Sequence, residues 1–340
     1  MGSIRVATLV LIVNAAAFPA SALAQDATTE LSIVSADAHL ELLFDGAVFA
    51  EGPAVAPDGS VYFSDITNTV LTDGQAGHIW RYDPGTGETR VFRSPSGMAN
   101  GIAFDCQGHM IVAEGADFGG RSVTHTDMST GKSVILAGLY EGRTFNSPND
   151  LVIDSEGRIY FTDPRYSGHE PVEQPVQGVY RIDPDGTVAL IIRDAGKPNG
   201  IGLSPDQRTL YVASLDNGTL DFTRGGMLAY PGRMALLAYD LAPDGSAEFR
   251  EVVVDFSGGV GPDGITVDAD GNLYLTRPFQ PFGVQVYSPQ GELLATIPTP
   301  EQPANVTFGR GPSAMTLYIT ATTGLYRIDV ERSGIQLSCE

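Results

Sequence analysis

The chain has 340 residues, a formal net charge of −21 and two cysteines. So acidic a surface repels phosphate backbones and anionic lipids, which argues against nucleic acids and membrane surfaces as partners. Neither cysteine belongs to a Cys-x-x-Cys motif, so a cysteine-based zinc cluster is excluded.

The first residues have the pattern of a secretory signal peptide. Arg5 provides a positive start, residues 6–20 form a short apolar run, and Ala22-Leu23-Ala24 is a small-residue cleavage signal. We therefore expect residues 1–24 to be removed and the mature protein to be periplasmic or secreted.

A retained membrane anchor is the alternative for this segment. The apolar run is short for a membrane span and is interrupted by Asn14 and Pro19, so cleavage is favoured and residues 25–340 form the mature domain. Export would permit a disulfide between Cys106 and Cys339, although their spacing does not establish that pairing.

The mature sequence repeats one pattern six times. Each copy has a short apolar run, a polar turn that usually contains Asp and Gly, and a second run rich in β-formers, which together predict a β-hairpin. The copies are residues 54–65, 103–114, 152–163, 202–214, 266–277 and 307–320.

A second pair of strands follows most hairpins, as in HIWRYDPGTGETRVF and GVYRIDPDGTVALII. Six units of four antiparallel strands predict an all-β, six-bladed β-propeller. The sixth unit is short after the run at 324–330, whereas residues 40–46 resemble an outer strand with no inner strands before them. We therefore expect the N-terminal strand to close the ring onto the sixth blade, which removes two exposed sheet edges.

One position in every repeat carries a side-chain oxygen. It lies eight residues before the turn glycine or its equivalent, at the start of the strand expected to line the central channel. The six residues are Glu51, Asn100, Asn149, Asn199, Asp263 and Asn305.

Six such residues in register predict a metal site on the axis. Turn chemistry alone would explain one Asn or Asp before a strand, but two acids converging without a base would repel each other unless a cation lay between them. Hard oxygen donors without His or Cys favour Ca²⁺ over zinc or copper, with Mg²⁺ and Mn²⁺ as alternatives.

The motifs around these positions carry a family resemblance over about the whole mature chain. EGP at 51–53, FNSPND at 145–150, IYFTDP at 159–164, PNGI at 198–201 and GPDGI at 261–265 resemble the SMP-30/gluconolactonase/regucalcin-like family, closest to bacterial gluconolactonases. The resemblance implies a metal-dependent lactonase that acts on a small-molecule lactone such as glucono-1,5-lactone.

The resemblance also implies roles for individual residues. It makes Glu51, Asn199 and Asp263 metal ligands, Asn149 a fourth ligand or a substrate-side amide, and Asn100 a residue that borders the substrate. One departure concerns the substrate: many gluconolactonases have Glu-His-Gly where this chain has Glu-Gly-Ala at 114–116.

Lactone hydrolysis needs a base for the attacking water, and Asp263 is our first choice, with Glu51 second. Arg165 and Tyr166, in a loop expected to overhang the channel, could contact sugar hydroxyls or simply pack the loop. His169 follows in that loop and is the best placed histidine for a catalytic role. Two other functions stay open: a phosphotriesterase-like or other ester hydrolase, and a non-enzymatic binding propeller with a structural metal.

Overall fold

The computed structural model describes residues 32–217, 219–221, 226–228 and 233–337. The predicted signal peptide and Cys339 lie outside these ranges, so the cleavage site and the pairing of Cys106 with Cys339 stay predictions. Within the described residues, no helix has both the length and the apolar character needed to cross a membrane.

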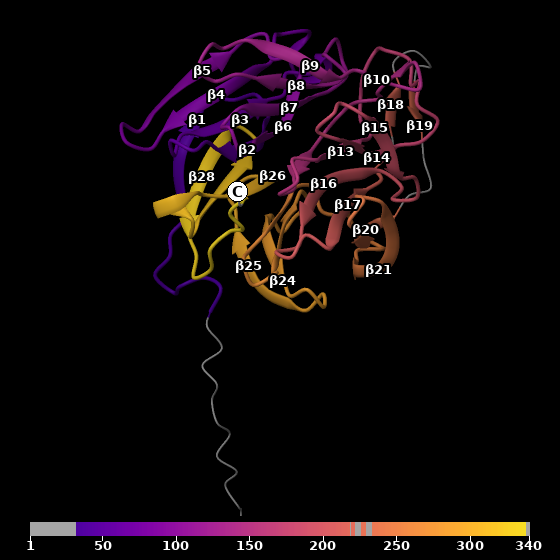
Figure 1. The fold of residues 1–340 in the computed structure, drawn as a ribbon. Coiled ribbons are helices and arrows are strands. Elements are labelled where there is room, and N and C mark those ends of the chain that lie inside the picture. Colours follow the sequence, from indigo (N-terminus) through magenta and orange to yellow (C-terminus); the bar gives the residue numbers. More distant parts are fainter. Residues whose placement is uncertain (1–31, 218, 222–225, 229–232, 338–340) are drawn as a thin grey trace, which may run out of the picture. The chain divides into compact units, whose positions relative to one another are not determined.

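The described residues form six four-stranded antiparallel sheets around one axis, which confirms the predicted propeller (Figure 1). In each of the first five blades, the strand nearest the axis comes first in sequence and contacts the innermost strands of the neighbouring blades. From the axis outward, the first blade contains β2 (Ala50–Val55), β3 (Val61–Asp65), β4 (His78–Asp83) and β5 (Glu88–Arg93), and the second contains β6 (Ala99–Phe104), β7 (Met110–Glu114), β8 (Ser122–Thr126) and β9 (Ser133–Ala137). The third contains β12 (Leu151–Ile153), β13 (Ile159–Asp163), β14 (Gly178–Ile182) and β15 (Val188–Ile192), and the fourth contains β16 (Pro198–Leu203), β17 (Thr209–Leu215), β20 (Met234–Leu241) and β21 (Ala247–Asp255). The fifth contains β22 (Ile265–Val267), β23 (Leu273–Arg277), β24 (Gly283–Tyr287) and β25 (Leu293–Pro298).

The sixth blade joins the two ends of the described chain. Its strands are β26 (Pro303–Phe308), β27 (Thr316–Ala321), β28 (Gly324–Asp329) and, outermost, β1 (Glu41–Asp45). β1 pairs antiparallel with β28, and Figure 1 shows the indigo strand beside the yellow one. The predicted closure of the ring by the N-terminal strand is therefore confirmed.

The hydrophobic core lies between blades rather than at one centre. Because side chains alternate across a strand, each blade packs one face against each neighbour. Leu210 and Val212 of β17 pack towards the third blade, for example, whereas Tyr211 packs towards the fifth. Six buried clusters of this kind, one at each blade interface, hold the ring together.

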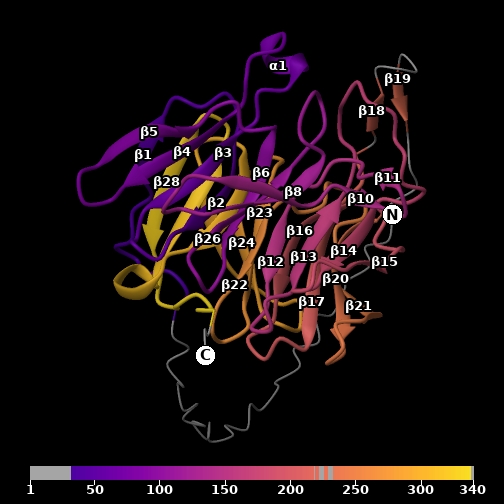
Figure 2. The ribbon, with the colours of Figure 1, turned by 45° about the horizontal axis from the view of Figure 1, so that its top comes forward.

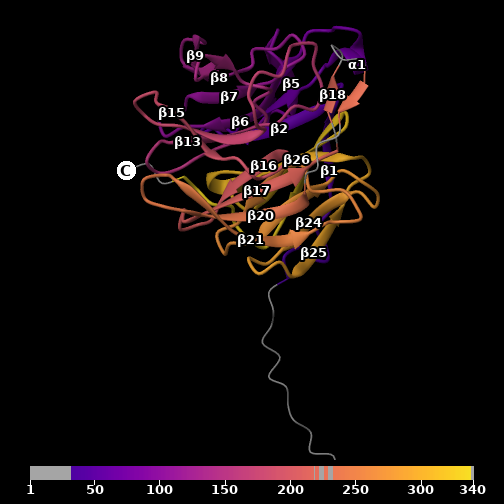
Figure 3. The same cartoon turned by 90° about the vertical axis from the view of Figure 1, so that its right-hand side faces the viewer.

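Short elements decorate the loops between strands. They are the helix α1 (Thr69–Thr72), a 3₁₀ turn at Gly311–Ser313, and the hairpins β10 (Leu139–Tyr140) with β11 (Arg143–Thr144) and β18 (Thr219–Asp221) with β19 (Gly226–Leu228). Figures 2 and 3 show α1 and β18 at the same end of the ring. The connections at this end surround the axial cavity described next.

Candidate active site at the propeller axis

Six oxygen-bearing side chains occupy equivalent positions at one end of the innermost strands, as the sequence register predicts. Four of them belong to β2, β6, β16 and β26, and the other two lie two residues before β12 and β22. All six are buried; they are Glu51, Asn100, Asn149, Asn199, Asp263 and Asn305. Because the innermost strands contact one another around the ring, these side chains converge towards the axis.

A cavity of about 240 Å³ at this end of the axis brings together most of the predicted site. Asn68, the N-cap of α1, and the exposed Phe279 also belong to its lining. Its lining includes two acids and, among the described residues, neither Lys nor Arg. The predicted residues in its wall are Glu51, Asn100, Asn149, Tyr166, Asn199 and Asp263.

Tyr166 is held against the site by two neighbours. The Nδ2 atom of Asn199 donates to Oδ1 of Asp263 and, over 3.0 Å, to the Tyr166 hydroxyl. The ammonium of Lys197 lies 3.9 Å from the centre of the Tyr166 ring and donates to Asn217 over 3.1 Å. Lys197, which directly precedes β16, was not among the residues predicted from the sequence.

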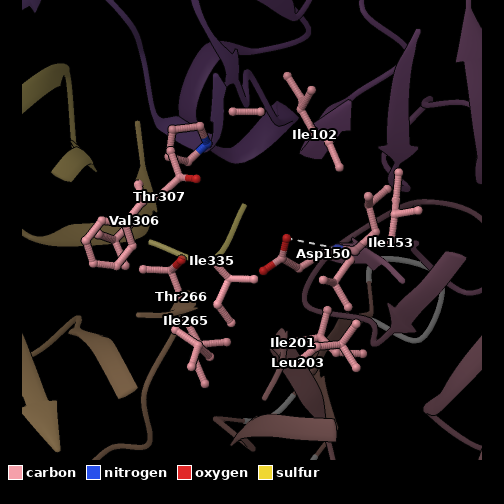
Figure 4. A pocket seen from close by; sticks show the side chains of 18 of the residues that line it. Ile102, Asp150, Ile153, Ile201, Leu203, Ile265, Thr266, Val306, Thr307 and Ile335 are labelled. Atoms are coloured by element: carbon pink, nitrogen blue, oxygen red, sulfur yellow. Dashed lines mark hydrogen bonds between the residues drawn. The ribbon is translucent and has the colours of Figure 1, made fainter. Parts of the chain in front are cut away.

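Asp150 is a third carboxylate at the axis that the sequence analysis did not identify. It lies in a second cavity of about 220 Å³, on the other side of the axial residues, together with Asn305. Figure 4 shows its side chain in that cavity, which Ile201, Ile265 and Ile335 also line. Its Oδ1 atom accepts a hydrogen bond from the backbone of its chain neighbour over 2.9 Å, and its Oδ2 atom accepts one from Asn305 over 3.4 Å.

A signal for Asp150 exists in the repeat. The residue after the axial oxygen donor is glycine in four of the six copies, at positions 52, 101, 200 and 264. In the third copy that residue is Asp150, so an acid replaces the usual glycine beside the axis.

Burial makes the three axial carboxyl groups difficult to ionise. It raises the pKa of Glu51 well above the ordinary value, and the charges of Asp263 and Asp150 raise that pKa further. Burial and the charge of Asp150 raise the pKa of Asp263 to about 7, and burial raises the pKa of Asp150 to about 6. A cation placed among these groups would lower all three pKa values by stabilising the ionised forms.

The donor set fits a hard divalent cation. Carboxylate and carboxamide oxygens are the ligands that Ca²⁺ prefers in proteins, and the cavity wall offers both kinds. The Oδ1 atom of Asn100 is buried and has no hydrogen-bond partner within the described part of the chain. Since a buried acceptor is costly to leave unsatisfied, this atom suits an electropositive partner such as a metal ion or a substrate hydroxyl.

Close contacts between blades position the axial residues. The Gly101 amide donates to the Asn149 carbonyl over 2.7 Å, which ties β6 to the segment that carries Asn149 and Asp150. A Cβ atom on Gly101 would lie 2.7 Å from the Cα of Asp150, so the approach requires glycine.

The buried carboxylate of Asp163 holds the loop before Asn149. It accepts hydrogen bonds from the backbone amides of Asn146 over 2.8 Å and Ser147 over 2.7 Å. Burial raises the pKa of Asp163 to about 7. Asp163, the acid of the IYFTDP motif, thus fixes the backbone segment that carries the Asn149 side chain.

Arg165 does not belong to the lining of this cavity. Its side chain is 2% exposed, and its guanidinium donates to the Glu170 carboxylate over 3.2 Å and to the Ser167 carbonyl over 3.3 Å. These bonds bridge positions within one loop. Arg165 therefore packs the loop that carries Tyr166, and its contact with a substrate stays a prediction.

His169 lies in the loops beside the cavity rather than in its wall. Its Nε2 atom is 3.0 Å from the Thr69 hydroxyl and 3.5 Å from Oδ1 of Asp117, and its ring stacks on Phe118 at 4.8 Å. The three loops that meet there come from the first three blades. His169 thus connects loops and is not placed among the axial groups.

Fold and site together define a class of protein, the six-bladed propellers with an oxygen-lined axial site suited to one divalent cation. The model of the SMP-30/gluconolactonase/LRE-like region matches residues 49–323. The chain belongs to this family.

Relatives that are similar over most of the chain are lactone-hydrolysing enzymes by name. A gluconolactonase of Zymomonas mobilis is 29% identical over 331 residues, covering 89% of this chain and 84% of its own. A pentonolactonase of Haloferax volcanii is 27% identical over 275 residues, covering 78% and 81%. The solved structure of a gluconolactonase from Xanthomonas campestris superposes with a TM-score of 0.71 at 28% identity, covering 89% and 92%.

Proposed function

We propose that this lactone hydrolase acts on a sugar lactone such as glucono-1,5-lactone and holds Ca²⁺ through Glu51, Asn149, Asn199 and Asp263. The observation that carries the proposal is the convergence of buried acids and amides on one cavity whose described wall contains no basic residue. The gluconolactonase and pentonolactonase relatives support a sugar lactone as the substrate. Oxygen donors without nitrogen or sulfur support Ca²⁺ as the cation.

Each group of residues in the cavity has its own role in the proposed hydrolysis of the lactone. A bound divalent cation supplies Lewis acidity for the lactone carbonyl and its developing negative charge. Asp263 accepts a proton from water while the water oxygen bonds to the carbonyl carbon, and Glu51 is the second candidate for this role. The ring C–O bond then breaks, and its oxygen takes up the proton to give the hydroxy acid. Asn100, Asn149 and Tyr166 offer hydrogen bonds to the sugar hydroxyls.

A lactone panel assayed with and without chelator tests this function. We expect aldonolactones to be hydrolysed, the activity to disappear with a Ca²⁺ chelator, and added Ca²⁺ to restore it. Hydrolysis of phosphotriesters or linear esters but not lactones would contradict the substrate class. A metal that stabilises the protein in an inactive preparation would instead indicate a binding propeller.

The wall next to Asn100 bears on which lactone is accepted. Gly115 and Ala116 line the cavity where many gluconolactonases have a histidine and a glycine. We propose that this smaller wall tolerates more than one length of sugar carbon chain. The measurement is kcat/KM for five-carbon and six-carbon aldonolactones. A preference above about a hundredfold for either would contradict the proposal, since the loss of one contact changes kcat/KM by less than that.

We also propose that the protein acts in the periplasm or is secreted, because residues 1–24 have the pattern of a cleaved signal peptide. N-terminal sequencing of the protein from an exporting host should begin at Gln25. Recovery of a chain that begins at Met1 in the cytoplasm would contradict this location.

A further inference from the structure

The second blade carries two histidines and an aspartate at a distance from the axial cavity. Asp105 and His109 lie between β6 and β7, and His125 belongs to the adjacent strand β8. Ligand atoms of the three side chains all lie within 4.8 Å of one another. Their side chains are 18%, 31% and 25% exposed, so an ion can reach them from solvent.

The Asp105 carboxylate is fixed by the turn in which it lies. Its Oδ1 atom accepts hydrogen bonds from the backbone amides of Gln107 over 2.9 Å and His109 over 2.8 Å. Its Oδ2 atom therefore faces the imidazoles, 3.3 Å from Nδ1 of His109 and 3.6 Å from Nε2 of His125. The two imidazole rings themselves meet edge to face, with centres 4.5 Å apart.

The contact between Nδ1 of His109 and Oδ2 of Asp105 is a long hydrogen bond, and the separation from Nε2 of His125 is beyond hydrogen-bond range, so both distances also suit shared coordination of an ion. An N–H···O hydrogen bond is usually about 2.7–3.2 Å long. Zinc–ligand bonds of about 2.0–2.2 Å in a tetrahedron place neighbouring ligand atoms about 3.3–3.6 Å apart. The distances from Oδ2 to both imidazole nitrogens match that tetrahedral edge.

We propose that Asp105, His109 and His125 bind one Zn²⁺, with water as the fourth ligand. The site is separate from the axis, because the strand from Asn100 to Asp105 spans about 16 Å. The two sites also differ in chemistry, since imidazole nitrogen suits Zn²⁺ and oxygen donors suit Ca²⁺. A zinc ion here would fasten the β6–β7 turn to β8, and this role does not depend on the proposed lactonase function.

The test uses the tag-free mature protein saturated with Ca²⁺, so that the axial site does not compete for zinc. Zn²⁺ is titrated against a chromogenic chelator, and we expect one equivalent to bind and to raise the melting temperature. His109→Gln and His125→Gln should each weaken the affinity at least about tenfold, as loss of support for a metal site does. Asp105→Asn should weaken it as well while its Oδ1 atom still accepts the turn amides.

The matched control is His39→Gln, because His39 is an exposed histidine outside this cluster. It should leave zinc affinity unchanged, and all variants should keep the Ca²⁺-dependent rise in melting temperature. The spectrum of Co²⁺ bound to the unmutated protein provides a second readout, with strong visible absorption expected for a tetrahedral site. The proposal is overturned if no stoichiometric zinc binds, if both histidine variants bind as tightly as the parent, or if Co²⁺ shows only the weak octahedral spectrum.

Discussion

The Asp263 side chain lies in the cavity wall next to Asn199, and burial and the charge of Asp150 raise its pKa to about 7. Asp263→Asn keeps the size and one oxygen donor but removes the group that can accept a proton. We expect kcat to fall by about a hundredfold or more, and the loss to persist at saturating Ca²⁺, because general-base catalysis contributes on that scale. Initial rates of lactone hydrolysis measure it, and an unchanged rate would move the base to Glu51.

Glu51→Gln should behave differently if Glu51 is mainly a ligand. The change removes one negative charge from the site, so Ca²⁺ should bind more weakly while the proposed base stays in place. Activity at low Ca²⁺ should be small, and excess Ca²⁺ should restore much of it. Calcium titrations of activity and of melting temperature would separate the two roles, and a deficit that calcium does not repair contradicts a ligand-only role.

The axial carboxyl groups also predict how stability depends on pH without metal. Asp150 and Asp263 have folded-state pKa values of about 6 and about 7, raised above the ordinary value near 4. Their protonation stabilises the fold below about pH 4, and that stabilisation is lost as pH rises through 6 and 7. The chelated protein should therefore melt at lower temperature at pH 7.5 than at pH 5.

Calcium at the proposed axial site should reverse this trend, because a cation there would bind the ionised carboxylates and bind better as they deprotonate. Asp150→Asn is the matched variant, since it cannot ionise and should flatten the pH dependence of the chelated protein. Melting curves from pH 4 to 8 with chelator or Ca²⁺ provide the measurement. Equal pH dependence with and without calcium would show that these groups are not linked to the metal.

At the scale of the strand, β6 lies so close to the segment that carries Asn149 and Asp150 that one methyl group added to Gly101 should disturb their packing. Gly101→Ala would place a Cβ atom 2.7 Å from the Cα of Asp150 and 2.8 Å from the Asn149 carbonyl, both backbone atoms. We expect a loss of about 1–3 kcal/mol in the free energy of unfolding, as overpacking usually costs, together with weaker calcium binding. Denaturant unfolding with calcium titration measures both effects.

Gly259→Ala is the control for that substitution. Its added Cβ atom would meet only the Phe256 carbonyl at 3.5 Å, an ordinary contact. It should leave both stability and calcium affinity almost unchanged. If the two variants are equally stable, the contact between the innermost strands does not constrain the site.

The elements themselves were largely predictable because hairpin signals repeat six times. The register of one turn residue also located the axial donors, since equivalent positions in a closed ring converge by symmetry. Side-chain partners were not predictable in this way. The Arg165 guanidinium donates to Glu170 within its own loop. Asp150 accepts a hydrogen bond from Asn305, and Lys197 lies over the Tyr166 ring, so both contacts join segments that are far apart in sequence. The repeat marks Asp150 as an acid where glycine is usual, but it does not encode which partners these side chains contact.

For the whole molecule, the most direct prediction concerns the strand that completes the ring. Phe44 of β1 contacts Phe63 and Trp80 of the first blade, with ring centres 5.7 and 4.9 Å apart, while the strand itself pairs with β28. Deleting residues 40–45 removes these contacts and exposes an edge of the sixth blade. We expect a fall in melting temperature of several degrees or more and loss of calcium binding at the proposed axial site, both measured by calorimetry.

Glu41→Ala provides the comparison for the deletion. It breaks only the ion pair between Glu41 and Arg327, which is 2.7 Å long and largely exposed. Such surface pairs contribute at most about 1 kcal/mol, so the melting temperature should change little. A deletion that is no more harmful than this substitution would contradict the closing role of β1.

The same closure has a consequence for the order of events in folding. Glu41 and Arg327 are 286 positions apart in the chain, so the contact that seals the ring is among the most distant in sequence that the fold contains. Contacts of such separation form slowly, because the entropy of a long loop is lost before the contacts stabilise the chain. A chain that emerges from its N-terminus first must therefore wait, its opening strand unpaired, until the final blade has been made. During that interval the strand edge is open to pairing with other chains, and the period of greatest risk for aggregation ends only when the last strand arrives.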